Sequence, residues 1–73
     1  MTDAELVRAA VQASGMSTGR WAVLVAHVGE RTVRRWIAGQ YEIGNPELRE
    51  RIARQLARHT AALMPDRRRN DDH

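Results

Sequence analysis

The apolar residues of this chain recur at intervals of three and four positions, which is the spacing of one face of an α-helix. No alternation of apolar and polar residues, the pattern of a strand, competes with this spacing. The pattern predicts four helical segments, at about residues 3–14, 17–28, 30–38 and 46–64. We therefore expect an all-α fold, a compact bundle of four or five helices.

Capping and helix-breaking residues support these boundaries. Thr2 and Glu5 have the spacing of a capping box ahead of the first helix, and Ser17 is a favourable N-cap for the second. Two glycines close the first and third helices, Gly15 and Gly39. The fourth helix opens with three residues that favour a helix N-terminus, Asn45, Pro46 and Glu47. Pro65 is expected to stop it.

The helices carry apolar faces, and these faces predict the core. On the first helix the face comprises Leu6, Ala9, Ala10 and Ala13. On the second it comprises Trp21, Leu24, Val25 and Val28, and on the fourth Leu48, Ile52, Leu56 and Leu63. Trp21 and Trp36 both lie on apolar faces, so we expect them to pack in the core rather than to stack on bases.

Length and composition limit the domain organisation. A chain of 73 residues makes one domain, which we assign to residues 1–64. The end of the chain, DRRRNDDH, has no apolar residue, so residues 65–73 are predicted to form a disordered tail of mixed charge. The acidic start and the short apolar run WAVLVA predict neither a signal peptide nor a membrane span. These features indicate a soluble, cytoplasmic protein.

Several classes of chemistry find no support in the sequence. The chain has no cysteine, which excludes disulfides and thiolate metal sites. Its three histidines show no ligand spacing, so no metal or other cofactor is expected, and His59 is interpreted as a surface residue. No paired carboxylates, glycine-rich phosphate loop or nucleophile–base pair occurs. We therefore expect neither an enzyme nor a small-molecule substrate.

The charge is basic, and it is localised. The net charge is +3, and all twelve basic residues are arginine, a choice that codon bias in a GC-rich genome explains. Their positions carry more information. Residues 29–40 contain three arginines against one glutamate, and residues 46–64 contain four arginines against two glutamates. Localised basic charge suits a polyanionic partner.

The stretch GERTVRRWIAGQ, residues 29–40, separates into two faces when it is projected as a helix. The apolar face comprises Val33, Trp36, Ile37 and Gln40. The opposite face comprises Glu30, Arg31, Arg34, Arg35 and Ala38. Arginine can bridge guanine O6 and N7, glutamate can accept from cytosine N4, and a small residue permits close approach to bases. This face therefore meets the requirements of a helix in a DNA major groove.

An ordinary solvated face is the alternative interpretation of the same residues. In that case Glu30 and Arg34 are simply an exposed i, i+4 ion pair, worth a few tenths of a kcal/mol. The neighbourhood favours DNA, because a short turn at residues 28–29 joins this helix to a preceding one. That is a helix-turn-helix arrangement in which the basic helix comes second, the position of a recognition helix.

The segment GERTVRRWIAG resembles the recognition helix of the lambda-repressor/Cro-like (Xre-type) helix-turn-helix regulators, many of which are phage proteins. Val33, Trp36 and Gly39 match the apolar, tryptophan and glycine positions of that family. Trp21 and Ala22 match the apolar residue and alanine of its first motif helix. The following segment, YEIGNPEL, resembles the loop and helix start that come next in the family.

The resemblance covers about residues 15–56. The span from Trp21 to Glu30 is one residue longer than the commonest family pattern. In addition, His27 or Gly29 stands where the family usually has glycine and serine or aspartate. Either the turn is looser than usual or the first motif helix ends differently.

The projection and the resemblance together imply a set of DNA contacts. The expected base contacts are Glu30, Arg31, Arg34 and Ala38. The expected phosphate contacts are Arg35, Thr32, Ser17, Arg20 and Tyr41. Tyr41 has a second interpretation, in which it closes the core together with Ile43. On the fourth helix the stripe of Arg51, Arg54 and Arg58 is expected to be a solvated face, with phosphate binding as the alternative.

The function implied by the resemblance is that of a sequence-specific double-stranded DNA-binding transcriptional regulator, a small phage or bacterial repressor. It would insert residues 30–38 into the major groove. The alternative is an interaction module of the same fold, such as a small phage-encoded inhibitor that docks on an acidic host protein. RNA binding is less favoured, because the sequence offers no exposed aromatic platforms for single strands.

Family members usually bind palindromic operators as dimers, so the resemblance also implies a homodimer. The candidate surface is the second half of the fourth helix, and its predicted interface residues are Leu56, Thr60 and Leu63. The alternative is that this apolar stripe packs against the first helix of the same chain.

Overall fold

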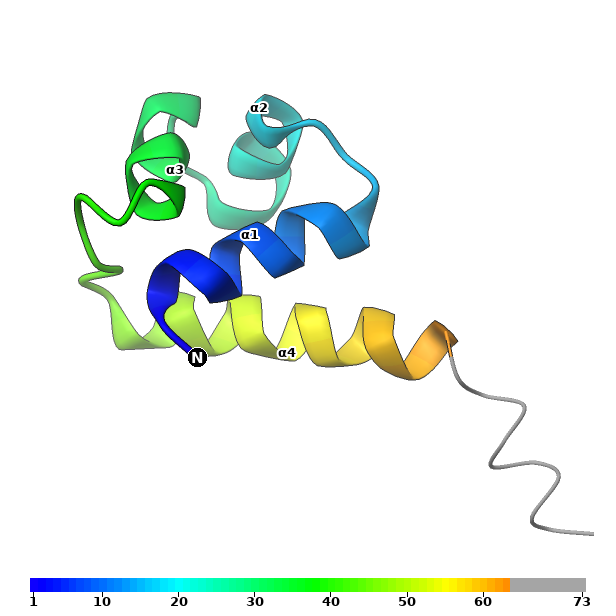
Figure 1. The fold of residues 1–73 in the computed structure, drawn as a ribbon. Helices are drawn as coiled ribbons and strands as arrows, with labels where there is room; N and C mark the ends of the chain where they lie inside the picture. The colour runs from blue at the N-terminus through cyan, green and yellow to red at the C-terminus, as the bar shows by residue number, and fades with distance from the viewer. Residues whose placement is uncertain (64–73) are drawn as a thin grey trace, which may run out of the picture.

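The computed structural model describes residues 1–63, with side chains up to Ala61. In chain order the elements are α1 (Asp3–Ser14), α2 (Thr18–Trp21), η1 (Ala22–Ala26), α3 (Glu30–Ile37) and α4 (Pro46–Leu63). η1 is a π-helical turn that continues α2, and no strand occurs within residues 1–63. The predicted all-α bundle of four or five helices is confirmed (Figure 1). The tail predicted at residues 65–73 lies outside the described residues.

The capping signals act as predicted. Thr2 Oγ1 accepts from the Glu5 N–H at 3.2 Å, and Glu5 Oε1 accepts from the Thr2 N–H at 2.8 Å, which completes the capping box. Gly15 ends α1 in the left-handed region at a φ of 73°. At the start of α4, Asn45 Oδ1 accepts from the Glu47 N–H at 2.9 Å. These local bonds explain why the two long helices begin where the sequence places them.

The helices pack in layers, with α1 between α4 and the α2–α3 pair (Figure 1). The largest fully buried side chains come from four different elements, Val7, Trp21, Val33 and Ile52. Both tryptophans are core residues as predicted, since Trp21 is fully buried and Trp36 is 6% exposed. Trp21 Nε1 also donates to Gln55 Oε1 at 3.0 Å, so the buried indole has a partner on α4.

On α1 the predicted core face is partly wrong. Leu6 and Ala10 are buried as expected, but Ala13 is exposed and Ala9 is only half-buried. The remaining buried positions of α1 are Val7 and Val11. The reason is that α1 is covered on two sides, by α3 and by α4. Its buried stripe is therefore wider than a single-sided helix requires, and it takes in the larger valines.

The face predicted for the second helix is also wrong in part, because η1 widens the backbone. A π-helical turn bonds each N–H five residues back, so it holds one more residue than an α-turn. Leu24, expected in the core, is 53% exposed, whereas Ala22 and Ala26 are buried. Between Trp21 and Glu30 the wider turn holds one residue more than an α-helical turn would. The second predicted helix therefore ends in a π-helical turn at Ala26.

The turn after η1 depends on a left-handed residue. His27 has φ 57° and ψ 39°, a conformation that favours glycine, and its N–H bonds to the Ala22 carbonyl oxygen. Gly29 is the N-cap of α3. The turn at residues 27–29 thus joins α2 and η1 to α3 in a helix-turn-helix arrangement.

The third helix is held by its buried face and by a bond at its end. Val33 is fully buried beside Trp36, and Arg8 Nη2 of α1 donates to the Ile37 carbonyl oxygen at 3.3 Å. The helix ends at Ile37, one residue earlier than predicted, with Gly39 left-handed at a φ of 78°. Gln40, assigned to the apolar face, is exposed because the helix has already ended there.

The fourth helix, α4, packs against α1 and is hydrogen-bonded to the N-terminal end of α1. Arg49 Nε bonds to Asp3 Oδ1 at 2.6 Å, while Asp3 Oδ2 accepts from the Ile43 N–H at 2.9 Å. These two bonds hold the pKa of Asp3 below its usual value, and the bond from Arg49 has the larger effect.

None of the helices in residues 1–63 is long and apolar enough to cross a membrane.

Candidate nucleic-acid interface

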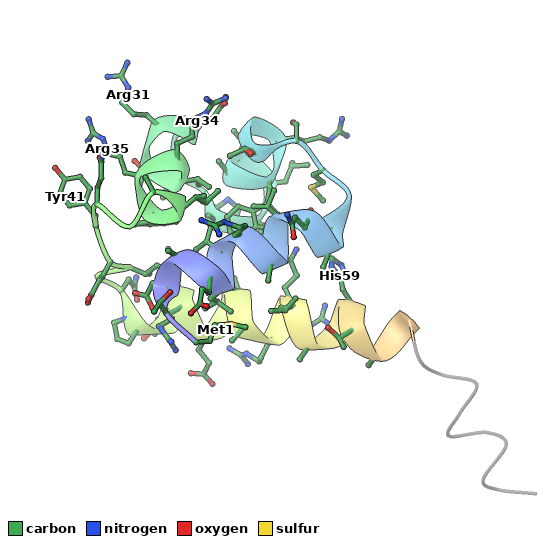
Figure 2. All side chains as sticks on the ribbon, viewed as in Figure 1. Met1, Arg31, Arg34, Arg35, Tyr41 and His59 are labelled. Carbon is green, nitrogen blue, oxygen red and sulfur yellow. The ribbon has the colours of Figure 1, made fainter. Side chains whose placement is uncertain are left out.

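The outer face of α3 presents three arginines from a helix whose inner face is anchored in the core. Arg31, Arg34 and Arg35 are exposed, and Figure 2 shows their side chains extending outward from the bundle. Ala38, just past the helix end, is exposed as well. Because Val33 and Trp36 fix the rotation of the helix, the arginines are held on the side away from the core. The projection made from the sequence is confirmed for these residues.

Glu30 and Arg34 form an ion pair across one turn of α3. Arg34 Nε donates to Glu30 Oε2 at 2.7 Å, and Arg34 Nη2 pairs with the same oxygen. The Arg34 side chain remains 70% exposed. The carboxylate engages only the Nε–Nη2 edge of the guanidinium, so the Nη1–Nη2 edge stays open to a ligand. The arrangement holds an arginine in one orientation and leaves it two parallel donors.

Gly19 of α2 makes room for this pair. A Cβ built on Gly19 would lie 2.6 Å from Glu30 Oε1, closer than real Cβ contacts come. Only glycine therefore lets the Glu30 carboxylate lie against α2 in this position. No role was assigned to Gly19 from the sequence. The signal that it had a packing role was its place inside a helical pattern, where glycine otherwise costs stability.

A second arginine of the face contacts an aromatic ring. The guanidinium carbon of Arg35 lies 5.6 Å from the centre of the Tyr41 ring, within the range of a cation–π contact. Tyr41 is 58% exposed, so its packing interpretation is wrong, whereas Ile43 is buried. Figure 2 places both side chains on the same edge of the molecule, beside the C-terminal end of α3. This edge offers a guanidinium and a phenol to one anionic group.

The remaining residues assigned to phosphate contacts lie in α2 and α3. Ser17 is exposed, and its hydroxyl oxygen caps α2 by accepting from the Arg20 N–H at 3.2 Å. The hydroxyl hydrogen of Ser17 is therefore still free to donate to another group. Arg20 is exposed, and Thr32 is half-buried on α3.

The residues predicted to form a dimer interface differ in how exposed they are. Leu56 is half-buried and packs against the core, which fits the alternative that the stripe covers its own chain. Thr60 is exposed, and its hydroxyl donates to the Leu56 carbonyl oxygen at 2.9 Å. The side chain of Leu63 lies outside the described residues.

His59, interpreted as a surface residue, is half-buried instead, and its Nδ1 is buried without a hydrogen-bond partner among the described residues.

Comparison with known proteins adds no assignment to this geometry. The chain matches no protein-family model, no curated protein and no solved structure.

Proposed function

We propose that this chain is a sequence-specific double-stranded DNA-binding transcriptional regulator, a small cytoplasmic repressor of phage or bacterial type, and that it inserts α3 into the major groove. The observation that supports this most directly is the exposed arginine face of α3, carried by the second helix of a helix-turn-helix. Its inner residues, Val33 and Trp36, are buried, so the helix that carries the face is anchored in the core before any ligand binds. Binding to a preorganised face costs less free energy, because less of the protein has to be ordered.

The geometry supports the following assignment of roles. Arg31 and Arg34 read bases through bidentate guanidinium contacts, and the small side chain of Ala38 permits close approach. Glu30 was expected to contact a base. The ion pair with Arg34 favours a positioning role for it instead, because the carboxylate is already occupied. The phosphate contacts come from the edges of the motif, namely Ser17, Arg20, Thr32, Arg35 and Tyr41.

Binding of two half-sites would require a homodimer, for which the second half of α4 is the proposed surface. Thr60→Glu is the variant that tests it, because Thr60 is exposed whereas Leu56 also packs against the core. Sedimentation should show a dimer for the unmodified chain on a palindromic duplex and loss of that dimer in the variant. A monomer in both cases contradicts this part of the proposal.

The experiment for the function as a whole is a titration of the purified chain with a duplex selected from random sequences and with a shuffled version of it. Specific binders prefer their site over non-specific DNA by about 10³-fold or more. Binding to both should weaken as salt rises, because phosphate contacts release counterions. Equal affinity for the two duplexes would contradict the proposal that the chain is a sequence-specific regulator. It would favour the alternative, a module that docks on an acidic protein.

A further inference from the structure

A groove of about 320 Å³ runs between η1 and α4. Leu24 and Val25 form its wall on η1, and Arg51, Arg54 and Arg58 form its wall on α4. The groove is separate from the arginine face of α3. Figure 2 shows Arg31 and Arg35 extending from α3 on the side remote from α4.

The apolar wall exists because of the π-helical turn. The turn directs Leu24 outward, where it is 53% exposed, and its neighbour Val23 is 62% exposed. Val23 and Leu24 are the two large aliphatic side chains of residues 17–38 that the fold leaves largely in water. Adjacent exposed aliphatic residues beside polar ones are a feature of protein-binding sites, and π-helical turns often occur at functional sites.

The opposite wall is basic. Arg51, Arg54 and Arg58 follow one another at intervals of three and four residues, so they share one face of α4. Within the described residues none of the three forms an ion pair or a side-chain hydrogen bond. Between them Gln55 uses its Oε1 to accept from Trp21, which leaves its amide hydrogens to donate. The residues that line the groove on α4 therefore offer hydrogen-bond donors, and the lining includes no carboxylate.

We propose that this groove binds an acidic segment of a partner protein. An aliphatic side chain of that segment packs against Leu24 and Val25, and carboxylates on either side of it pair with Arg51, Arg54 and Arg58. Guanidinium groups bind carboxylates in a bidentate manner, and the apolar wall supplies the contact area that an ion pair alone lacks.

The two walls together select this occupant over others. A second copy of this chain, docked by two-fold symmetry over the groove, would bring the same arginines against one another, and like charges in contact disfavour association. A DNA backbone would satisfy the arginines but, apart from its sugar carbons, would offer little apolar surface to Leu24. An acidic segment with an aliphatic residue complements both walls.

The test is a selection of short random peptides on the full chain, followed by binding measurements with the enriched peptides. Peptides with an aliphatic residue flanked by carboxylates should be enriched. Their affinity should fall by roughly tenfold or more with either Leu24→Ser or Arg54→Ala, because each removes one wall of the groove. Arg35→Ala is the matched control, since it removes an exposed arginine outside the groove, and peptide binding should be unchanged.

Three results would overturn the proposal. The first is that no peptide is enriched, and the second is that the enriched peptides lack carboxylates or bind the two groove variants as well as the unmodified chain. The third is that a DNA duplex displaces the peptide and loses affinity in Arg54→Ala, which would make the stripe a nucleic-acid surface. Circular dichroism of Leu24→Ser and Arg54→Ala should show intact helices, because both side chains are exposed.

Discussion

Replacing Gly19 with alanine is expected to weaken binding to the preferred duplex while leaving the fold intact. The new Cβ would lie 2.6 Å from Glu30 Oε1 and 3.2 Å from Glu30 Cδ, so the carboxylate has to move. Both atoms are at the far end of a flexible side chain, which can rotate away at small cost. The movement breaks the hydrogen bond that Arg34 Nε donates to Glu30 Oε2 at 2.7 Å.

The expected magnitudes differ for folding and for binding. Alanine stabilises a helix relative to glycine by up to about 1 kcal/mol. Loss of an exposed Glu–Arg pair lowers the stability by about a few tenths of a kcal/mol. The free energy of unfolding should therefore stay within about 1 kcal/mol of its original value. Binding is affected more, because an arginine that is no longer held must be ordered on DNA, at a cost of about 0.5–1.5 kcal/mol. This corresponds to a roughly 2- to 10-fold loss of affinity.

The assay is fluorescence anisotropy with the preferred duplex at one fixed salt concentration. Gly44→Ala is the matched control, because a Cβ there meets nothing within 4 Å, and it should bind as the unmodified chain does. The decisive comparison is Gly19→Ala in an Arg34→Ala background. If Glu30 acts by holding Arg34, the glycine substitution has no further effect there. An equal loss of affinity in both backgrounds would refute the reasoning.

Three further substitutions test the fold and its pH dependence. Trp36→Ala should lower the free energy of unfolding by about 3–5 kcal/mol in denaturant titrations, since the ring is buried, and an unchanged midpoint would mean that α3 is rotated. His27→Gly should raise the thermal midpoint by removing a left-handed side chain, a gain of up to about 1 kcal/mol, and a lower midpoint would contradict the assigned turn. Asp3 has a lowered pKa, so its contribution is present above the usual carboxyl pKa and is lost as the pH falls through the lower folded value, below about pH 4. Asp3→Asn should reduce the stability lost in acid, leaving the part due to Glu5, and an identical acid profile would argue against the Asp3–Arg49 and Asp3–Ile43 bonds.

The sequence predicted those features that depend on neighbouring residues. The boundaries of α1 and the start of α4 were predicted correctly because caps such as Thr2 and Asn45 act within a few residues. The outer face of α3 was also correct, because a tryptophan and a valine at helical spacing fix which side is buried. In these places local chemistry and tertiary packing favour the same answer.

The errors occur where packing decides. The π-helical turn at η1 directs Leu24 into water, and a periodicity of 3.6 residues cannot represent a turn that holds one residue more. The contact between Gly19 and Glu30 joins two helices, so no local spacing encodes it. The groove depends on both α4 and η1, so no local spacing predicts it, although Arg51, Arg54 and Arg58 are exposed as the solvated-face interpretation expected.

The most direct test of DNA reading by α3 is a parallel selection of duplexes from a random pool by the unmodified chain and by Arg34→Ala. The proposed function predicts one enriched sequence for the unmodified chain. It predicts the same sequence for the variant with the preference lost at a single guanine, because Arg34 presents an open pair of donors from a fixed position. Failure to enrich any sequence, or enrichment of an identical sequence by both proteins, would contradict it.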